Sequence, residues 1–449
     1  MRMIRNMAAA VVGMVLMATA LVTPGGTAEA AAAKGELELF PGQVITATFS
    51  GTKLDKNRQV SLEKSTDDGS TWTSVKTVKM NSKGKANFGI VPTAATDHYR
   101  AVAKALTYKV KKKKVTAAAV VSNMGRISAP DFRDEFSVAP LSDIWRSRDE
   151  VGYKASGRWC SAPVSANTSV GSVDGRSSAV LKMTAKKNPG KVIAEAKEQQ
   201  KDANKAAVGK ADAAVAKAEA NLAKAKAMPQ KTKSQKKKRS AAIKKAESAL
   251  KKAKSARAAL TPGCPNGVYE NAMVTTQGSG QTFRAGTVVA SVKFARGQGA
   301  HAGIWLQAPN GQEIDIIEAY GHGRGVTNVI HRREGGVLKK IPAVDKDAYV
   351  AASTVKSDKW WSKWHTVAVT VDTKRVVFHL DGVKTRELKV SGMAADDYSL
   401  MISLLSSDWE TYRVKKPDVR PGSGVKKSTV KKQPLPRLSV DWIRVWKKA

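Results

Sequence analysis

The chain has few cysteines and few long apolar segments for its length. Only two of its 449 residues are cysteine, Cys160 and Cys264, and each is alone in its neighbourhood. This excludes a zinc site built from closely spaced cysteines. Beyond the N-terminal segment, no stretch approaches the roughly 20 apolar residues that a membrane-spanning helix needs. The sequence therefore predicts no membrane span in the body of the protein.

The N-terminal segment has the pattern of a secretory signal peptide. Basic residues come first, an apolar run extends from Met7 to Val22, and Ala28-Glu29-Ala30 gives the Ala-x-Ala cleavage pattern. We expect residues 1–30 to be removed and the protein to be secreted, extracellular or associated with the cell wall. A retained N-terminal anchor is the alternative. In an oxidising compartment, Cys160 and Cys264 are expected to form one disulfide.

Acidic residues are scarce beside basic ones. There are 38 Asp and Glu against 77 Lys and Arg, which gives a formal net charge of +39. Such a charge favours polyanionic partners such as nucleic acid, anionic lipid or an acidic polymer. No nucleic-acid-binding motif accompanies it, and much of it lies in low-complexity tracts. We therefore expect a monomer that attaches to an anionic cell-wall polymer and does not bind nucleic acid.

The first part of the mature chain reads as short strands separated by turns. Val44–Phe49, Gln59–Glu63 and His98–Val102 have strand patterns, and Asp67-Asp-Gly-Ser-Thr-Trp72 is a turn signal between them. This spacing predicts a small β-sandwich over residues 31–108, which resembles the Ig-like accessory modules of bacterial secreted proteins. The lysine-rich stretch that follows predicts a solvated basic linker over residues 109–130.

A second domain is predicted over residues 131–449, with an insertion of different composition. Residues 188–262 are nearly all Ala, Lys, Glu and Gln, which favours helix, and Met228-Pro229-Gln230 interrupts the run near its middle. We expect a hairpin of two antiparallel helices. One interpretation is a solvated insertion without a partner. The other is a cationic arm that binds teichoic acid or another polyanion, with binding weakened by salt.

Strand patterns resume after the insertion and continue to the C-terminus. They occur in Gly286–Phe294, His301–Leu306, Glu313–Glu318, Val326–Ile330, His365–Val371, Arg375–Leu380 and Leu438–Trp446. No long amphipathic helix lies between them. The fold class is therefore predicted to be mainly β, with two packed sheets.

The most informative segment is Gly311-Gln-Glu-Ile-Asp-Ile-Ile-Glu-Ala-Tyr-Gly321. In a strand, residues i and i+2 share a face, so Glu313 and Asp315 point the same way while Ile314 points into the core. Glu318 follows Glu313 by five positions, and a regular strand would bury its carboxylate at a high cost. One extra residue, a β-bulge near Ile316-Ile317, returns Glu318 to the acidic face.

Three carboxyl groups on one face suit acid–base chemistry. Crowded like charges favour one protonated carboxyl beside an ionised one. A retaining glycosidase needs its two carboxyl groups about 5–5.5 Å apart, one as nucleophile and one as general acid/base. A solvated acidic face with no catalytic role is the alternative.

Glu-Ile-Asp-Ile-Ile-Glu resembles the signature of glycoside hydrolase family 16 in its bulged form. The resemblance implies a concanavalin-like β-jelly-roll with a sugar-binding cleft on a concave sheet. It also implies that Glu313 is the nucleophile, that Glu318 is the general acid/base, and that Asp315 hydrogen-bonds the nucleophile. No cofactor is implied, and whether structural calcium binds is left open.

Other landmarks resemble the family in order along the chain. These landmarks are Phe132–Phe136, Ala302–Leu306, His331, Trp364-His365, Leu380–Gly382, Trp409 and Val440–Val445. The resemblance implies a substrate-binding role for Trp305, His331 and Trp409. Two segments depart from the family pattern. His301-Ala302 stands where glucanases of the family often have Trp-Pro, and Ser403–Trp409 lacks the usual glycines.

The sequence thus predicts a retaining endo-glycoside hydrolase that cleaves a β-linked polysaccharide, with a β-1,3- or β-1,3-1,4-glucan as the expected substrate. Two alternatives are kept. One is a transglycosylase of the same family, in which a sugar replaces water as the acceptor. The other is a non-catalytic carbohydrate-binding protein, although a lectin has no need of both Glu313 and Glu318.

Overall fold

The computed structural model describes residues 35–50, 56–110, 112–147, 161–182, 184–186, 190–259, 268–294, 300–320, 325–342, 350, 358–405 and 437–448. The predicted signal peptide, Cys160, Cys264 and Trp409 lie outside the described residues. None of the described helices has the length and apolar character needed to cross a membrane.

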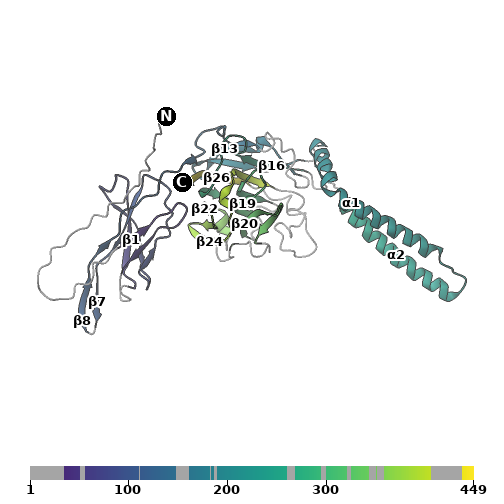
Figure 1. The fold of residues 1–449 in the computed structure, drawn as a ribbon, viewed down its shortest axis with the longest axis horizontal. Helices are drawn as coiled ribbons and strands as arrows, with labels where there is room; N and C mark the ends of the chain where they lie inside the picture. The colour runs from purple at the N-terminus through teal and green to yellow at the C-terminus, as the bar shows by residue number, and fades with distance from the viewer. Residues whose placement is uncertain are drawn as a thin grey trace, which may run out of the picture.

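An N-terminal β-sandwich module comes first (Figure 1). Its two sheets have the strand orders β1-β2-β5 and β4-β3-β6-β9. The strands are β1 (Gly35–Glu38), β2 (Thr46–Phe49), β3 (Gln59–Ser65), β4 (Thr73–Lys79), β5 (Lys85–Asn87), β6 (His98–Ala103) and β9 (Val120–Val121). Alternating apolar residues of both sheets, among them Phe49, Leu62 and Tyr99, form a core of their own.

The predicted basic linker over residues 109–130 needs correction. Strands β7 (Leu106–Val110) and β8 (Lys113–Ala117) form a two-stranded ribbon, and β9 pairs with β6 of the sandwich. Thr107 and Thr116 face each other across the ribbon with their hydroxyls 3.0 Å apart. The lysines dominate the composition of this segment, but they lie on an exposed ribbon whose residues alternate as a strand requires.

The second domain is a sandwich of two larger sheets. The eight-stranded sheet has the order β13-β14-β26-β17-β22-β23-β24, with β10 paired to β26. Its strands are β10 (Phe132–Asp134), β13 (Thr168–Val173), β14 (Arg176–Lys182), β17 (Gly286–Lys293), β22 (His365–Val371), β23 (Val376–Leu380), β24 (Val383–Leu388) and β26 (Arg437–Lys447).

The nine-stranded sheet has the order β11-β16-β25-β18-β19-β20-β21, with β12 and β15 paired to β16. Its strands are β11 (Arg146–Ser147), β12 (Ser161–Pro163), β15 (Thr184–Lys186), β16 (Val268–Thr275), β18 (His301–Gln307), β19 (Glu313–Tyr320), β20 (Gly325–Glu334), β21 (Val337–Ile341) and β25 (Ser399–Leu405). The predicted mainly β, jelly-roll-type architecture is confirmed.

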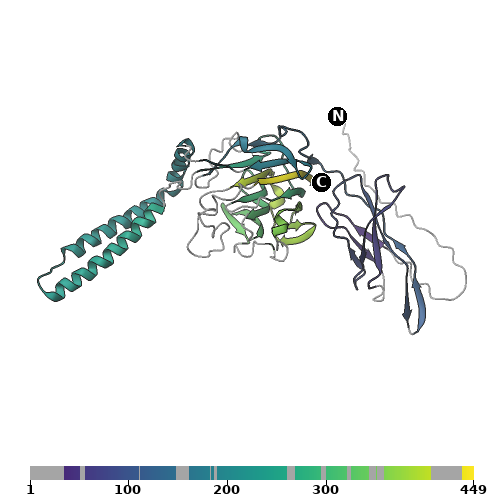
Figure 2. The same cartoon turned by 180° about the vertical axis from the view of Figure 1, so that it is seen from behind.

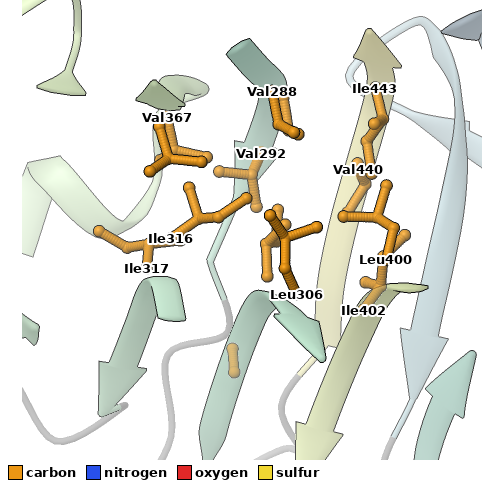
Figure 3. Close-up of a cluster of buried hydrophobic side chains, with 14 of the residues drawn as sticks. Val288, Val292, Leu306, Ile316, Ile317, Val367, Leu400, Ile402, Val440 and Ile443 are labelled. Carbon is orange, nitrogen blue, oxygen red and sulfur yellow. The ribbon is translucent and has the colours of Figure 1, made fainter. Parts of the chain in front are cut away.

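The two sheets bury one apolar core between them. Figure 3 shows Val288, Val367 and Ile443 of the eight-stranded sheet close to Ile316, Leu306 and Ile402 of the nine-stranded sheet. Most of these side chains alternate along their strands, as a half-buried sheet requires, while Ile316 and Ile317 are consecutive and both face the core. The outer face of each sheet is thereby left for other contacts.

The predicted helical hairpin is confirmed. Helices α1 (Gly190–Ala227) and α2 (Lys233–Ala259) run antiparallel and project away from the β-domains (Figures 1 and 2). Lys254 pairs with Glu219 at 3.0 Å, and Arg257 pairs with Asp212. The hairpin is inserted between β15 and β16, which are hydrogen-bonded to each other. The sheet can accept it there because the insertion only replaces the connection between two neighbouring strands.

The N-terminal module packs on the outer face of the eight-stranded sheet. Val289, Ala368 and Trp446 of that face form a buried cluster with Ile127 and Leu39. The Trp446 indole N–H donates to the carbonyl oxygen of Ser128 at 2.8 Å. The module therefore covers one side of the second domain, and the outer face of the nine-stranded sheet lies on the other side.

Candidate active site

A β-bulge lies in the middle of β19. Against β18, Ile304 pairs with Ile317 and the next residue, Trp305, pairs with Asp315, so Ile316 is the extra residue. The pairing of β19 with β20 shifts at the same place, between Asp315 and Glu318. Ile316 and Ile317 are both buried in the core. The bulge predicted from the five-residue spacing of the glutamates is confirmed.

The bulge places three carboxyl groups on the outer face of the nine-stranded sheet. Glu313 and Glu318 are partly exposed, whereas Asp315 between them is buried. Their cross-strand neighbours are Gln307 and His331 for Glu313, Trp305 and Val329 for Asp315, and Gly303 and Thr327 for Glu318.

Glu318 is held at both of its carboxyl oxygens. Oε1 lies 2.7 Å from Nε2 of His301, and Oε2 accepts a hydrogen bond from the Thr327 hydroxyl at 2.9 Å. The side chain is 18 % exposed, so it is fixed in orientation while part of it faces outward. A carboxyl group in this position is able to exchange a proton with a molecule bound on the outer face.

Glu313 lies against His331 and Gln307. Its Oε1 is 3.1 Å from Nδ1 of His331, and its Oε2 accepts a hydrogen bond from the Gln307 amide at 3.3 Å. The same His331 nitrogen is 3.6 Å from Oδ2 of Asp315. His331 therefore faces two of the three carboxyl groups.

Asp315 is the group whose protonation the site perturbs most clearly. Burial raises the pKa of Asp315 well above its usual range, and the charges of Glu318 and Glu313 raise it further. The charge of Lys340 acts in the opposite direction, and a hydrogen bond to Glu313 raises the pKa again. Asp315 is thus favoured as a neutral acid that donates a hydrogen bond to the Glu313 carboxylate.

Glu313, Asp315 and His331 also satisfy the distance requirement for a cation site. One ligand atom of each lies within 4.8 Å of the others, in the part of the chain that the structure describes. Burial raises the pKa of Asp315, so a metal ion there would compete with a proton for the same oxygens.

Trp305 adds an apolar surface beside the carboxyl groups. It is half-buried against Met273, Met401 and Leu405 on the same outer face. Its indole N–H donates to the Ser403 hydroxyl at 3.1 Å, which fixes the ring plane. An indole ring next to acidic groups is suited to contact with a sugar ring.

Residues 225–423 match the model of the glycosyl hydrolases family 16. The chain therefore carries a family 16 glycoside hydrolase domain. The protein is accordingly a glycoside hydrolase, an enzyme that acts on O-glycosyl bonds. No curated protein matches it.

Among solved structures, the chain is similar to several glucan-degrading enzymes at low identity. The laminarinase catalytic domain of Thermotoga maritima matches with a TM-score of 0.42 and 15% identity, over 71% of this chain and 98% of that one. The endo-β-1,3-glucanase of Pyrococcus furiosus matches with a TM-score of 0.40 and 14% identity, over 76% and 97%. A mixed-linkage glucan enzyme of family 16 from Bacteroides ovatus matches with a TM-score of 0.40 and 13% identity, over 70% and 99%.

The family 16 domain brings most of the predicted site residues together. Glu313, Asp315, Glu318, Trp305 and His331 share one face, whereas Trp409 lies outside the described residues. The sequence alone did not indicate that His301 and Thr327 contact Glu318. The signal for His301 was its departure from the family pattern, at the first position of the strand that contains Trp305.

Proposed function

We propose that the family 16 domain is a secreted, retaining endo-glycoside hydrolase in which Glu313 is the nucleophile and Glu318 the general acid/base. The observation that carries this proposal is the bulge at Ile316, because it puts both glutamates on one open face. A strand without it would direct Glu318 into the core.

The first chemical step uses Glu318 as the acid and Glu313 as the nucleophile. The Glu318 carboxyl gives its proton to the glycosidic oxygen while the Glu313 carboxylate attacks the anomeric carbon. The bond to the leaving sugar breaks and an ester to Glu313 forms. Asp315 donates a hydrogen bond to Glu313, which steadies the carboxylate before the attack.

In the second step, Glu318 acts as a base. Its carboxylate takes a proton from water, whose oxygen attacks the anomeric carbon and breaks the ester to Glu313. Two inversions at one carbon give a product with the anomeric configuration of the substrate. If a second sugar takes the place of water, the same site acts as a transglycosylase.

We propose a β-1,3- or β-1,3-1,4-glucan as the substrate. The family 16 match and the indole of Trp305 beside Asp315 support a polymer of β-linked sugars. Reducing-end release from laminarin, mixed-linkage glucan, xylan and galactans is the test, with wild type and Glu313→Gln compared. Cleavage of a glucan by wild type alone supports the proposal, whereas binding without cleavage by both proteins favours a carbohydrate-binding protein.

The helical hairpin supports a second, separate proposal, that it attaches the enzyme to a phosphate-rich anionic cell-wall polymer. Residues 190–259 contain 20 basic and 6 acidic residues. Two of the acidic residues, Glu219 and Asp212, already pair with lysine and arginine of α2. Most side chains of the described part are exposed, so the excess positive charge faces solvent.

Retention on immobilised teichoic acid and on inorganic polyphosphate tests the hairpin proposal. The matched variants replace Lys236, Lys237, Lys244 and Lys245 of α2 by Gln, or the four lysines Lys109, Lys112, Lys113 and Lys114 of the β7–β8 ribbon. Loss of salt-sensitive retention in the first variant alone supports the proposal. Equal retention of both variants and the wild type contradicts it.

A further inference from the structure

His301 is a buried histidine in direct contact with the carboxyl group proposed as the acid/base. It is 7% exposed, and its Nε2 lies 2.7 Å from Oε1 of Glu318. On its other side, the imidazole ring lies against Tyr320 with the ring centroids 4.5 Å apart. The ring is thus fixed by packing, and the side chain is too enclosed to serve only as a surface group.

The register of β18 and β19 explains how His301 reaches Glu318. The residue directly opposite Glu318 is Gly303, which has no side chain. A Cβ at Gly303 would meet the Ser403 hydroxyl oxygen and the Trp305 ring, each at 3.3 Å. Because Gly303 places no side chain opposite Glu318, His301, two positions earlier on the same face, contacts Glu318 diagonally across the strands.

The second oxygen of Glu318 has a matching partner. The Thr327 hydroxyl donates to Oε2 from β20, so donors from the two flanking strands hold the two oxygens. Each carboxyl oxygen has two lone pairs. Accepting one hydrogen bond from His301 or Thr327 therefore uses only part of the capacity of each oxygen.

We propose that His301 is a positioning residue that donates its Nε2–H to Glu318 and stabilises the carboxylate formed when Glu318 has protonated the leaving sugar. This inference rests on the proposed acid/base role of Glu318. In the first step the proton moves from Glu318 to the glycosidic oxygen, and the His301 proton stays on Nε2. In the second step, the same donor orients the carboxylate that takes a proton from water.

Other charged groups around this pair must be included in any pH dependence. On β19 they are Asp315, Glu313 and Tyr320, and His331 and Lys340 come from β20 and β21. On the other side of β18, the described strand β25 has no titratable side chain. Because substitution of His301 leaves all of these groups in place, a change in the pH profile reports on the Glu318 contact.

The test compares His301→Phe with His301→Gln. Phenylalanine keeps a ring against Tyr320 but lacks the donor, whereas glutamine offers an N–H donor that cannot ionise. Without the donor, the Glu318 carboxylate is less stable, so the alkaline limb of kcat/KM moves to higher pH, by about one unit. We expect kcat/KM at neutral pH to fall about 10- to 100-fold for the polymer, within the range of general acid–base effects.

Leaving-group dependence provides the second measurement. A dinitrophenyl glycoside needs little protonation to depart, so His301→Phe should lose much less kcat/KM with it than with a phenyl glycoside. His301→Gln should keep the wild-type limb and the wild-type ratio of the two substrates. Thermal unfolding of both variants shows whether they fold, and His301→Gln remains informative if His301→Phe does not.

The outcomes separate this inference from the proposed function. A wild type that cleaves none of the polysaccharides overturns the proposed function itself. If the wild type cleaves and Glu313→Gln does not, an unchanged alkaline limb and leaving-group ratio in folded His301→Phe overturn the role of His301. A folded His301→Gln that behaves as His301→Phe overturns the donor assignment.

Discussion

The side-chain amide of Asn328 donates a hydrogen bond to the main-chain carbonyl oxygen of Ile316, the bulged residue of β19, at 2.7 Å. Asn328 is 1% exposed, and its own Oδ1 accepts a hydrogen bond from the Thr385 hydroxyl of the opposite sheet at 2.8 Å. A bulge removes a residue from the regular ladder of the sheet. Asn328 supplies a side-chain donor to the Ile316 carbonyl at the bulge.

Replacing Asn328 by Ala should therefore loosen the bulge. A buried carbonyl left without a donor costs about 1–3 kcal/mol in the free energy of unfolding. We also expect kcat/KM to fall, because Glu318 follows the bulge by two residues. Thr385→Val is the control, since it breaks the link to the opposite sheet but leaves the Ile316 hydrogen bond. Equal activity of the two variants would contradict this role of Asn328.

Asp315→Asn should change how stability depends on pH. Because the folded protein holds the pKa of Asp315 above its unfolded value of 3.8, the native state keeps this proton longer than the unfolded chain does. The stabilisation is complete below the unfolded pKa and is lost as the pH rises towards the folded one. The slope is at most about 1.4 kcal/mol per pH unit.

Asparagine cannot ionise, so Asp315→Asn should gain stability relative to wild type as the pH rises above about 4. Denaturant unfolding of both proteins over a series of pH values measures this difference. Glu334→Gln is a control for an exposed acid whose pKa is lowered, and its relative stability should change in the opposite direction. Parallel curves for wild type and Asp315→Asn would show that Asp315 ionises as easily in the folded protein as in the unfolded chain.

The two glutamates should respond differently to an added nucleophile. Glu318→Ala should lower kcat/KM for the polymer about 10²–10⁴-fold, with a smaller loss for a dinitrophenyl glycoside. Azide should rescue it and give the β-glycosyl azide, because azide attacks the ester on Glu313. Glu313→Ala should give the α-glycosyl azide, since azide then attacks directly from the opposite face. The same azide anomer from both variants would contradict the assignment of roles.

The contact between the N-terminal module and the eight-stranded sheet gives a prediction about stability. Gly42 has φ +72°, and a Cβ there would clash with Cβ of Ala368. Gly175 has φ +77° with nothing within 4 Å of such a Cβ. Gly175→Ala should cost about 1–2 kcal/mol for the left-handed backbone alone. Gly42→Ala should cost about 1–3 kcal/mol more because of the clash.

Calorimetric unfolding of the two glycine variants measures this difference. If the module stays docked in solution, Gly42→Ala lowers the unfolding temperature clearly more than Gly175→Ala does. Equal shifts would mean that the module does not pack against Ala368.

The acidic strand could be predicted from the sequence because the residues that determine its conformation lie within the strand itself. Five-residue spacing between two glutamates, with isoleucines between them, leaves few arrangements that avoid burying a carboxylate. The helical hairpin was equally predictable from sequence. The helix-favouring composition and the helix-breaking Pro229 both lie within the segment itself. In contrast, the ribbon that includes Lys109 and Lys113 was missed because solvated lysines are compatible with a linker as well as with an exposed strand.

Contacts between distant segments were harder to predict. The role of His301 depends on Glu318, 17 positions later, and on a glycine opposite it, which only the strand register reveals. One sequence feature was compatible with the docking of the N-terminal module, namely the apolar run Val288-Val289-Ala290 in β17. A continuous apolar run indicates a strand that is buried on both faces, but it does not say what covers the outer one.

The proposed double displacement requires Glu313 and Glu318 to act on one anomeric carbon from the same face of β19. Proton NMR of the first product released from a β-glucan oligosaccharide tests this directly, before mutarotation equalises the anomers. Double displacement predicts that the β-anomer appears first, with the α-anomer growing only later. Initial release of the α-anomer would show a single displacement and contradict the proposed roles of Glu313 and Glu318.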